Sequence, residues 1–506
     1  MSRKQKLIFN TASGLTQRVV SMICGFLLPR YMLLYYGSTV NGLVSSITNF
    51  LSVISLLEMG VGPVIQSNLY KPLAENDSRR VSEIVRASNG FFHTIAYIFI
   101  LYITILCFIF PHINKEFNVL YIVSLIVIIA ISTFMQYFFG MTNQLLLNAD
   151  QLAFIQISLQ AVAVILNTAL CITLIKTGLS VHYVKLITAI VFTVRPLILY
   201  VYVKKHYCID KNIHLTENPI KQKWNGFAQH IAGFACGNTD IIVLTFFSSL
   251  SNVSVYSVYY SITLGLTQTM IAASTGLNSL FGNIIAKGEK EILHSSFEKA
   301  EYVIHSLGTI FYTTAGITAI PFVRIYTRGI NDVNYIVPSF AFVMVLAYAF
   351  QNYRIPYARI IEAAGHFKQT QNASFISVGI NITISIAVVH RLGLIGVAIG
   401  TLVAMLFETC FYAWYLKKNI LKRPMKLFLR YLFTDFIIAM TTVFVSQLVK
   451  MDTSSYYKWS AYVIIIMSIA TFLTMIVSRI VYRKLLSELI TNTVGRLMKK
   501  IRSINS

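Results

Sequence analysis

Ionisable side chains stand inside long apolar runs of this sequence, where they are costly to keep. Arg18 lies well within the first run, and Glu58 lies at a similar depth in the second. A charge at the centre of a bilayer costs about 2.5–3.5 kcal/mol on insertion scales, so it usually serves function. We expect Arg18 to offer charge to an anionic ligand, and Glu58 to neutralise it or to take up a proton or a sodium ion. The alternative is a buried ion pair that only holds two helices together.

Three further arginines stand beside or near prolines in apolar runs, namely Arg30, Arg195 and Arg354. The planar guanidinium binds anionic groups through paired hydrogen bonds, so these arginines are candidate ligands for an anionic cargo, which the family resemblance given below implies to be a pyrophosphate. Each could instead extend its charge to the membrane surface, because all three lie toward the ends of their runs. Glu408 and Asp435 are expected either to serve as counter-ions for Arg195 and Arg354 or to face lipid.

Polar and small residues recur at helical spacing within the same runs. Ser21 shares a helix face with Arg18, Gln268 stands on a second polar stripe, and a third stripe carries His230 and Asp240. Small residues alone would only let helices pack closely. Stripes that also carry ionisable groups favour a water-filled cavity instead. We therefore expect Ser21 and Gln268 to contact the ligand and Asp240 to act in ion coupling or as a counter-ion.

The sequence carries none of the motifs that would indicate an enzyme. It contains no phosphate-binding glycine-rich loop, no H-E-x-x-H and no nucleophile elbow. Its six cysteines are scattered without a C-x-x-C pair, which argues against a zinc site or a disulfide framework. We predict a protein that is not an enzyme and has no resident cofactor. Its energy would come from a sodium or proton gradient or from the membrane potential.

The elements that hold these residues are membrane-spanning helices. Of 506 residues, 56% are hydrophobic and 12% are charged, about half of the roughly 25% that soluble domains carry. The apolar residues fall into runs of about 20, which is the length that crosses a bilayer as a helix. We predict an all-α polytopic membrane protein with about 14 transmembrane helices. The expected spans are 8–33, 44–66, 89–110, 119–146, 153–175, 181–203, 226–247, 255–285, 302–325, 335–357, 371–389, 393–416, 431–449 and 459–481.

The basic residues set the expected orientation. The chain has 42 Lys and Arg against 19 Asp and Glu, and cytoplasmic loops are enriched in Lys and Arg. A cytoplasmic N-terminus places most of them inside and leaves few outside, among them Lys176, Lys185 and Lys450. We expect a bacterial cytoplasmic membrane protein with both termini in the cytoplasm. The excess charge then needs no nucleic acid, and it leaves membrane lipids as a partner for the basic tail.

The chain repeats itself at an offset of about 214 residues, which indicates duplicated lobes. Gln136 finds its counterpart in Gln351, and Lys204-Lys205 finds its counterpart in Lys417-Lys418. Because the repeat holds six spans, both copies point the same way, and a cleft between them is expected. The predicted organisation is an N-terminal six-helix lobe (1–210), a C-terminal six-helix lobe (211–425), two additional helices (426–482) and a basic cytoplasmic tail (483–506).

Two short motifs carry a resemblance to a known superfamily. They are Tyr36-Gly37-Ser-Thr-Val-Asn-Gly42-Leu43 after the first span and Leu56-Leu57-Glu58-Met59-Gly60-Val61-Gly62 in the second. With the paired lobes, the chain resembles the polysaccharide-export (Wzx-like) flippases of the multidrug/oligosaccharidyl-lipid/polysaccharide exporter superfamily, which includes MATE-like proteins. The resemblance implies flipping of undecaprenyl-pyrophosphate-linked oligosaccharide by alternating access, for surface polysaccharide biosynthesis. A polysaccharide polymerase and glycosyltransferases of the same pathway are then expected partners.

Two other functions remain open from the residues alone. A cation-coupled multidrug exporter of the same superfamily would use Glu58 and Asp240 as ion sites, although the arginines argue against it. A membrane-embedded glycan polymerase or ligase would need a large outer loop, which the spacing of the spans does not provide. The 14-span layout is also similar to that of lipid II flippases. That similarity implies a lipid-tail groove formed by the last two helices.

Overall fold

The computed structural model describes residues 2–58, 60–210, 238–488 and 491. These residues form helices without any strand, and ten helices among them are long and apolar enough to cross a membrane. The predicted all-α polytopic fold is therefore confirmed, while the count of about 14 spans stays a prediction. His230 and most of the expected span 226–247 lie outside the described residues, and a short apolar helix, Asn238–Phe247, forms the end of that span.

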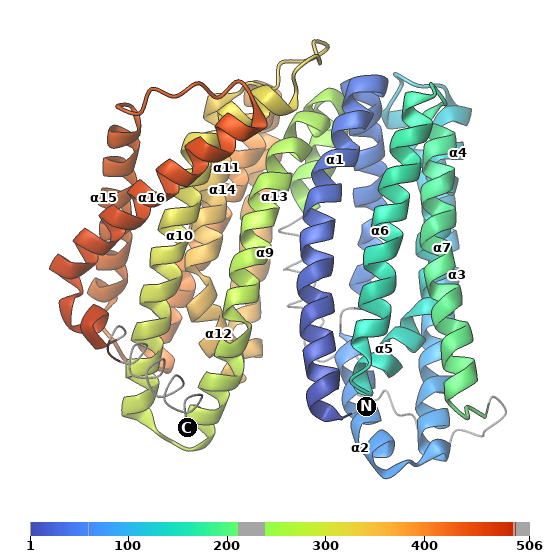
Figure 1. Ribbon diagram of the computed structural model, residues 1–506, viewed down its shortest axis with the longest axis horizontal. Coiled ribbons are helices and arrows are strands. Elements are labelled where there is room, and N and C mark those ends of the chain that lie inside the picture. Colours follow the sequence, from blue (N-terminus) through green and yellow to red (C-terminus); the bar gives the residue numbers. More distant parts are fainter. Residues whose placement is uncertain (1, 59, 211–237, 489–490, 492–506) are drawn as a thin grey trace, which may run out of the picture. The chain divides into compact units, whose positions relative to one another are not determined.

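Many helix bounds follow the expected spans, but the helices over 78–113 and 290–326 begin well before the expected starts at 89 and 302, and the first helix, over 3–52, runs through the expected gap between the first two spans. Figure 1 labels the α-helices. In the first part of the chain they are α1 (Arg3–Ser52), η1 (Val53–Leu57), α2 (Val61–Glu75), α3 (Ser78–Ile113), α4 (Val119–Met135), η2 (Gln136–Gly140), α5 (Met141–Ala149), α6 (Ala153–Lys176) and α7 (Val181–His206). The later helices are α9 (Leu250–Ala286), α10 (Lys290–Tyr326), α11 (Pro338–Tyr353), α12 (Ile355–Ala363), α13 (Phe367–Leu392), α14 (Leu394–Asn419), α15 (Met425–Ser446) and α16 (Tyr456–Val481).

The chain divides into two compact units. Unit 1 comprises 1–257 together with 329–333, and unit 2 comprises 258–328 together with 334–506. The division falls inside α9, so this helix contributes to both units. The six-helix lobe boundaries expected from the repeat stay a prediction.

In unit 1, a glycine divides the long helix α1 into two. Gly37 has φ 80° and ψ 175°, a conformation that breaks the helix and that a side chain would strain. Ser38 then begins the second helix, and Asp332 accepts hydrogen bonds from its backbone N–H (2.6 Å) and its hydroxyl (2.7 Å). Asp332 thus serves as a helix N-cap supplied from far along the chain. Gly37 lies in the gap between the expected spans 8–33 and 44–66, so this residue marks the boundary between the two helices.

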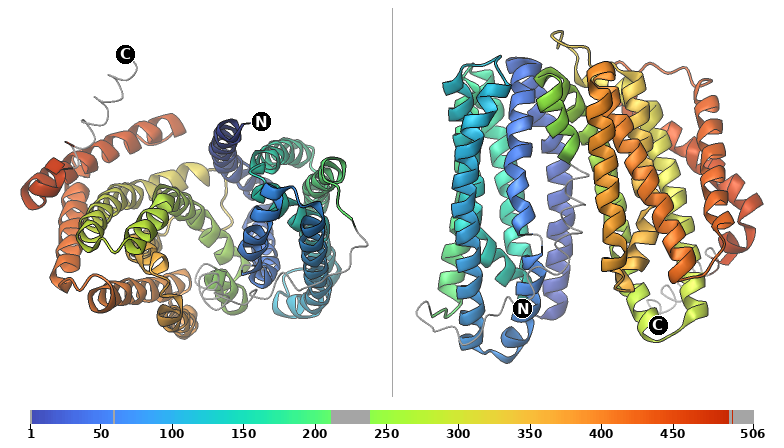
Figure 2. Two further views of the ribbon diagram at one scale, coloured as in Figure 1. Left: turned by 90° about the horizontal axis from the view of Figure 1, so that it is seen from below. Right: turned by 180° about the vertical axis from the view of Figure 1, so that it is seen from behind.

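A second break in unit 1 surrounds Glu58. The helix tightens into the 3₁₀ turn η1, and Glu58 follows as its C-cap before α2 begins at Val61. Backbone groups at such a break lack regular helical partners, which polar surroundings must then supply. The break therefore puts Glu58 at the point where the helix is locally interrupted. Within this unit α6 packs against α1 and α7, and α4 packs against α3 and α7 (Figures 1 and 2).

The fourth span of each predicted repeat is interrupted at a corresponding place. In unit 1 a π-helical turn, η2, separates α4 from α5 and begins at Gln136. In unit 2 Arg354 separates α11 from α12, shortly after Gln351, and Pro356 lies at the start of α12. A π turn and a proline both disturb the regular i to i−4 hydrogen bonding. The two glutamines matched by the sequence repeat thus mark equivalent interruptions.

Unit 2 is built around α10, α11, α13 and α14. The α13–α14 pair packs tightly, because a Cβ at Gly400 would collide with the Ser385 hydroxyl oxygen. The last two helices, α15 and α16, shown in red tones in Figures 1 and 2, both pack against α10. Their other faces expose large apolar side chains such as Phe433, Phe444 and Phe472, as a lipid-facing surface does.

Candidate functional site

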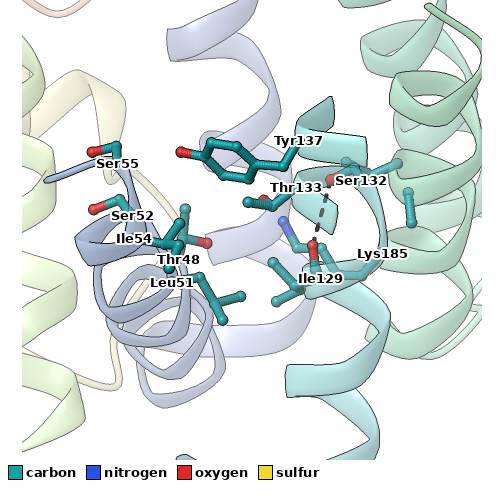
Figure 3. Close-up of a pocket in the computed structure, with 12 residues that line it drawn as sticks. Thr48, Leu51, Ser52, Ile54, Ser55, Ile129, Ser132, Thr133, Tyr137 and Lys185 are labelled. Carbon is teal, nitrogen blue, oxygen red and sulfur yellow. Dashed lines mark hydrogen bonds between the residues drawn. The ribbon is translucent and has the colours of Figure 1, made fainter. Parts of the chain in front are cut away.

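Unit 1 contains a cavity of about 350 Å³ that is rich in hydroxyl groups (Figure 3). Its walls come from the second half of α1, from η1, from α4 with η2, and from α7. Seven of its twelve lining residues carry a hydroxyl group, and one carries a positive charge. The lining residues are Thr48, Leu51, Ser52, Ile54, Ser55, Ile129, Ser132, Thr133, Tyr137, Lys185, Thr188 and Ala189.

Several of these hydroxyls already donate their proton to the helix that carries them. Thr48 donates to the carbonyl of Val44 and Ser52 to that of Asn49, at 2.8 and 2.6 Å. Thr188 likewise bonds the carbonyl of Val184 at 3.1 Å. A hydroxyl that donates locally keeps its lone pairs for other partners. The cavity wall therefore offers mainly acceptors, which suit ligand hydroxyl groups and cations.

Lys185 is the charged residue in the cavity wall. It lies one turn from the start of α7, and Figure 3 shows its nitrogen among the side chains that line the cavity. Within the described residues it forms no ion pair with a carboxylate. The charge pattern of the sequence places Lys185 among the outer-side charges, because a lysine at a span end normally extends to water. Its side of the membrane stays a prediction, and the structure adds that the Lys185 side chain lines the cavity.

Glu58 lies next to this cavity through Tyr137. The Tyr137 side chain lines the cavity and hydrogen-bonds the Glu58 carboxylate. The second carboxylate oxygen of Glu58, Oε2, is buried without a hydrogen-bond partner. A buried polar atom without a partner costs free energy, so it often marks a place where an ion, a proton or water binds. Glu58 therefore keeps the ion-coupling role predicted for it as a hypothesis.

The expected pairing of Arg18 with Glu58 is not formed. Arg18 is exposed on α1 and makes no ion pair with any described carboxylate, while Glu58 bonds Tyr137. Ser21, on the same helix, accepts a hydrogen bond from Gln17 at 2.9 Å. Arg30 is half-buried directly after Pro29 in the interior of α1. Equal depth along two helices, which is the basis of the expected pair, does not make two side chains face each other.

Arg195 is held in unit 1 by neutral amides. One of its guanidinium nitrogens donates to Gln156 Oε1 at 2.8 Å and to Gln144 Oε1 at 3.1 Å. Gln144 also accepts from Gln136 Nε2 at 3.1 Å, which joins the interrupted fourth span to the same network. No described carboxylate lies within ion-pair distance of Arg195, and its Nε is buried without a partner. The guanidinium is thus oriented but not neutralised.

Arg354, in unit 2, has a different environment. It forms an ion pair with Glu408, which also accepts a hydrogen bond from Ser374 at 2.9 Å. Its guanidinium lies 5.6 Å from the centre of the Tyr412 ring. Glu408 is therefore confirmed as a counter-ion of Arg354. Asp435, the other expected counter-ion, pairs instead with His305 at 2.6 Å.

The two remaining candidates lie apart from the cavity lining. Asp240 is 2% exposed in unit 1, and its Oδ2 accepts a hydrogen bond from the Tyr256 hydroxyl at 2.8 Å. Gln268 is exposed on the part of α9 that belongs to unit 2. Of the predicted site residues, six therefore lie in unit 1, and Arg354 and Gln268 lie in unit 2. None of the eight lines the cavity in Figure 3, and Glu58 reaches it through Tyr137.

Comparisons with known proteins identify the fold. No protein-family profile matches the sequence, and no curated protein matches it. Among solved structures, the chain is similar to the lipid II flippase MurJ in an inward closed conformation. The TM-score is 0.71 at 15% identity, and the match covers 95% of this chain and 100% of that chain.

Two MATE transporter structures are also similar. An inward-facing MATE transporter of the MOP superfamily matches with a TM-score of 0.62 at 14% identity, covering 82% of this chain and 99% of its own. A eukaryotic MATE transporter matches with a TM-score of 0.59 at 13% identity, covering 83% and 96%. The chain therefore has the fold shared by MurJ and the MATE transporters. These proteins are transporters and flippases rather than enzymes, in line with the prediction of transport.

Proposed function

We propose that this protein is a flippase that moves undecaprenyl-pyrophosphate-linked oligosaccharide across the bacterial cytoplasmic membrane by alternating access. The observation that carries the proposal is the uncompensated positive charge within unit 1. Arg18, Lys185 and Arg195 all lie within membrane-spanning helices, and none has a described carboxylate partner. Cations kept in such places are costly unless a ligand or water meets them. An anionic cargo is the partner that balances all three.

The chemistry of unit 1 matches the two ends of such a cargo. Arginine and lysine bind phosphate through charge-assisted hydrogen bonds, and the acceptor-rich cavity suits sugar hydroxyl groups. A cavity of about 350 Å³ is at the lower end of ligand pockets. It accommodates a phosphate or a single sugar rather than a whole oligosaccharide. Lys185 and Arg195 stand ten positions apart on α7, which is about 15 Å along the helix, so they would serve different parts of the cargo.

The fold supports the same function. MurJ, named as a lipid II flippase, covers 95% of this chain, whereas the two MATE structures cover 82% and 83%. The difference is about one eighth of the chain, which is similar to the length of the segment that holds α15 and α16. A lipid-linked cargo needs a surface for its polyprenyl tail, and the exposed apolar faces of α15 and α16 suit one. We place both termini in the cytoplasm on the basis of the basic loops.

Reconstitution in liposomes tests the proposal. Fluorescently labelled undecaprenyl-pyrophosphate-linked sugar is mixed into vesicles that hold the purified protein, and a membrane-impermeant quencher reports the fraction in the outer leaflet. We expect the wild type to move the lipid between leaflets. Arg195→Gln and Lys185→Gln should each slow it about tenfold or more, because a hydrogen bond to a charged group contributes about 1.5–3 kcal/mol.

Matched controls separate loss of charge from loss of packing. Thr188→Val removes a hydroxyl from the cavity wall beside Lys185 and leaves the charge in place, so it should reduce the rate far less. Undecaprenol-linked sugar without phosphate tests the anionic requirement. If the neutral lipid moves as fast as the pyrophosphate form, the charge argument fails. Transport of cationic dyes with no lipid flipping would instead indicate the multidrug exporter, with Glu58 and its unpartnered oxygen as the coupling site.

A further inference from the structure

A histidine and an aspartate meet inside unit 2, where α10 packs against α15. His305 Nδ1 lies 2.6 Å from Asp435 Oδ2, and Thr309 donates from its hydroxyl to Asp435 Oδ1 at 2.8 Å. His305 is 1% exposed and Asp435 is 7% exposed. Asp435 lies ten residues from the start of α15, about 15 Å along the helix. The dyad is therefore well inside the membrane-spanning part of the unit.

Aromatic rings enclose the imidazole and leave one nitrogen without a partner. The Tyr353 ring is parallel to it at 4.6 Å between ring centres, and the Tyr431 ring lies at 5.0 Å. His305 Nε2 is buried with no hydrogen-bond partner. Because Nδ1 faces the Asp435 carboxylate, it carries the hydrogen in that bond, and a neutral imidazole then has a bare lone pair on Nε2. This nitrogen is the place where one proton can be added.

The charged groups near the dyad already have other partners. Arg423 forms two hydrogen bonds to Glu301, at 2.6 and 2.7 Å, and Tyr357 from α12 also bonds Glu301. Arg430 of α15 stacks on Tyr482 at the end of α16, and Tyr482 hydrogen-bonds Thr434. On α11, the Tyr353 hydroxyl bonds Thr309 at 3.1 Å. A single proton therefore decides whether the dyad carries a net charge of −1 or 0.

We propose that His305 and Asp435 form a proton-binding site that couples cargo movement to the proton gradient. The inference rests on the proposed flippase function and adds its energy source. In the step itself, the Nε2 lone pair takes a proton from water on one side of the membrane, forming an N–H bond. That N–H bond later breaks, its electron pair stays on Nε2, and the proton passes to water on the other side. Each event changes the charge at the α10–α15 contact while the Asp435 hydrogen bond to Nδ1 stays in place. Ionisable groups inside membrane proteins commonly serve such relays.

The leaflet distribution of cargo under a pH gradient tests the coupling. In proteoliposomes with the labelled pyrophosphate lipid, one proton per cargo shifts the steady-state distribution by about tenfold for each pH unit across the membrane. We expect this shift for the wild type. His305→Gln keeps a hydrogen-bond donor for Asp435 but cannot be protonated, so it should flip lipid to an even distribution that ignores the gradient. His182→Gln is the matched control, because His182 bonds Ser124 and a backbone carbonyl and faces no carboxylate among the described residues.

The outcomes separate the two proposals. If the wild type equilibrates the lipid but the gradient leaves the distribution even, the coupling proposal is overturned and the flippase function stands. The coupling proposal is equally overturned if His305→Gln responds to the gradient as the wild type does. If the wild type moves no lipid, the flippase proposal fails, and proton binding is then judged on its own.

A direct measurement of proton binding needs no cargo. Wild-type protein labelled with ¹⁵N-histidine in lipid bilayers is followed by magnetic resonance across neutral pH. The signals of His305 are assigned by their loss in His305→Gln. We expect its Nε2 signal to move from that of a bare nitrogen to that of a protonated one as the pH falls. A signal that stays constant throughout would overturn the proton site whatever the transport assay gives.

Discussion

Replacing Gln156 by glutamate would give Arg195 the counter-ion that it lacks. The amide oxygen of Gln156 accepts from the guanidinium at 2.8 Å, so the new carboxylate oxygen takes the same position with almost no change in size. The other end of the Gln156 amide donates to Asn148 Oδ1 at 3.3 Å. Asn148 can turn its amide to donate in return. The substitution therefore changes charge with little disturbance of packing.

The size of the effect follows from the geometry. Two unit charges about 4 Å apart attract by about 4 kcal/mol at an effective dielectric constant of 20. Withdrawing the carboxylate from water offsets much of this gain, which leaves about 1–2 kcal/mol, or a factor of about 5–30. A cargo phosphate that uses Arg195 must displace this internal partner. We expect the apparent affinity for the pyrophosphate lipid to fall by about tenfold, while the protein melts at the same or a higher temperature.

The assay compares flipping rate with cargo concentration in proteoliposomes and thermal unfolding in detergent. Gln447→Glu is the control, because Gln447 is an exposed residue at the end of α15. The combination distinguishes two roles for Arg195, since a purely structural arginine would be better held by a carboxylate at this position than by an amide. Wild-type concentration dependence in a well-folded Gln156→Glu protein would refute the ligand role. So would a loss of transport that matches a loss of stability.

Three further predictions concern contacts inside the units. Arg423→Leu leaves the buried Glu301 carboxylate without its partner and should destabilise the protein by about 3–5 kcal/mol, measured by thermal unfolding. Burial lowers the pKa of Arg423, but the Glu301 charge outweighs burial and raises this pKa above its usual value. The arginine's contribution is therefore fully present at neutral pH and is lost only as the pH rises through the raised pKa. Gly400→Ala forces a Cβ against Ser385 and should lower the free energy of unfolding by about 1–3 kcal/mol. Gly379→Ala is the control, because open space surrounds Gly379. Equal melting temperatures of the two variants would contradict the packing argument. Asp332→Ala removes the N-cap of the helix that begins at Ser38 and should cost about 1 kcal/mol, while Asp452→Ala in an exposed loop serves as its control.

Hydropathy predicts many helix bounds well, because burial in a bilayer sets the length of an apolar run, but it misses the polar extensions with which α3 and α10 begin. The expected span 153–175 corresponds to α6, Ala153–Lys176, and 181–203 corresponds to α7, Val181–His206. The breaks are harder to predict. A conformation with positive φ at Gly37 and the 3₁₀ turn before Glu58 depend on contacts such as Asp332 with Ser38, which come from residues far apart in the sequence.

The charges of the site show a second limit. A sequence gives the depth of a residue along a helix but only a rough direction around it. Arg354 and Glu408 face each other, whereas Arg18 and Glu58 do not. The direction of the Lys185 side chain is hard to predict for a related reason, since a lysine one turn inside a span extends either to water or into the protein. The hydroxyl residues on the neighbouring spans are the one sequence pattern that indicates a polar surrounding for the face of α7 that carries Lys185.

The predicted repeat explains why the arginines of the two units need not share a function. By its register, α7 and α14 are the sixth spans, and α6 and α13 are the fifth. In unit 1 the junction of the fourth, fifth and sixth spans holds Arg195 between amides. In unit 2 the same junction holds Arg354 against Glu408, with Ser374 of the fifth span beside them.

A guanidinium at this junction is thus common to both units, which indicates a packing role that either arrangement satisfies. Only in unit 1 does it remain uncompensated among the described residues. If the charge served packing alone, selection for stability would favour a counter-ion in unit 1 as well, because an unpaired buried charge is costly. The cost is accepted where a ligand offsets it. We therefore expect Arg195, and not Arg354, to be the arginine that binds the anionic cargo. Gln156→Glu should accordingly slow transport. A substitution that gives Arg354 an additional hydrogen-bond partner should leave the transport rate unchanged.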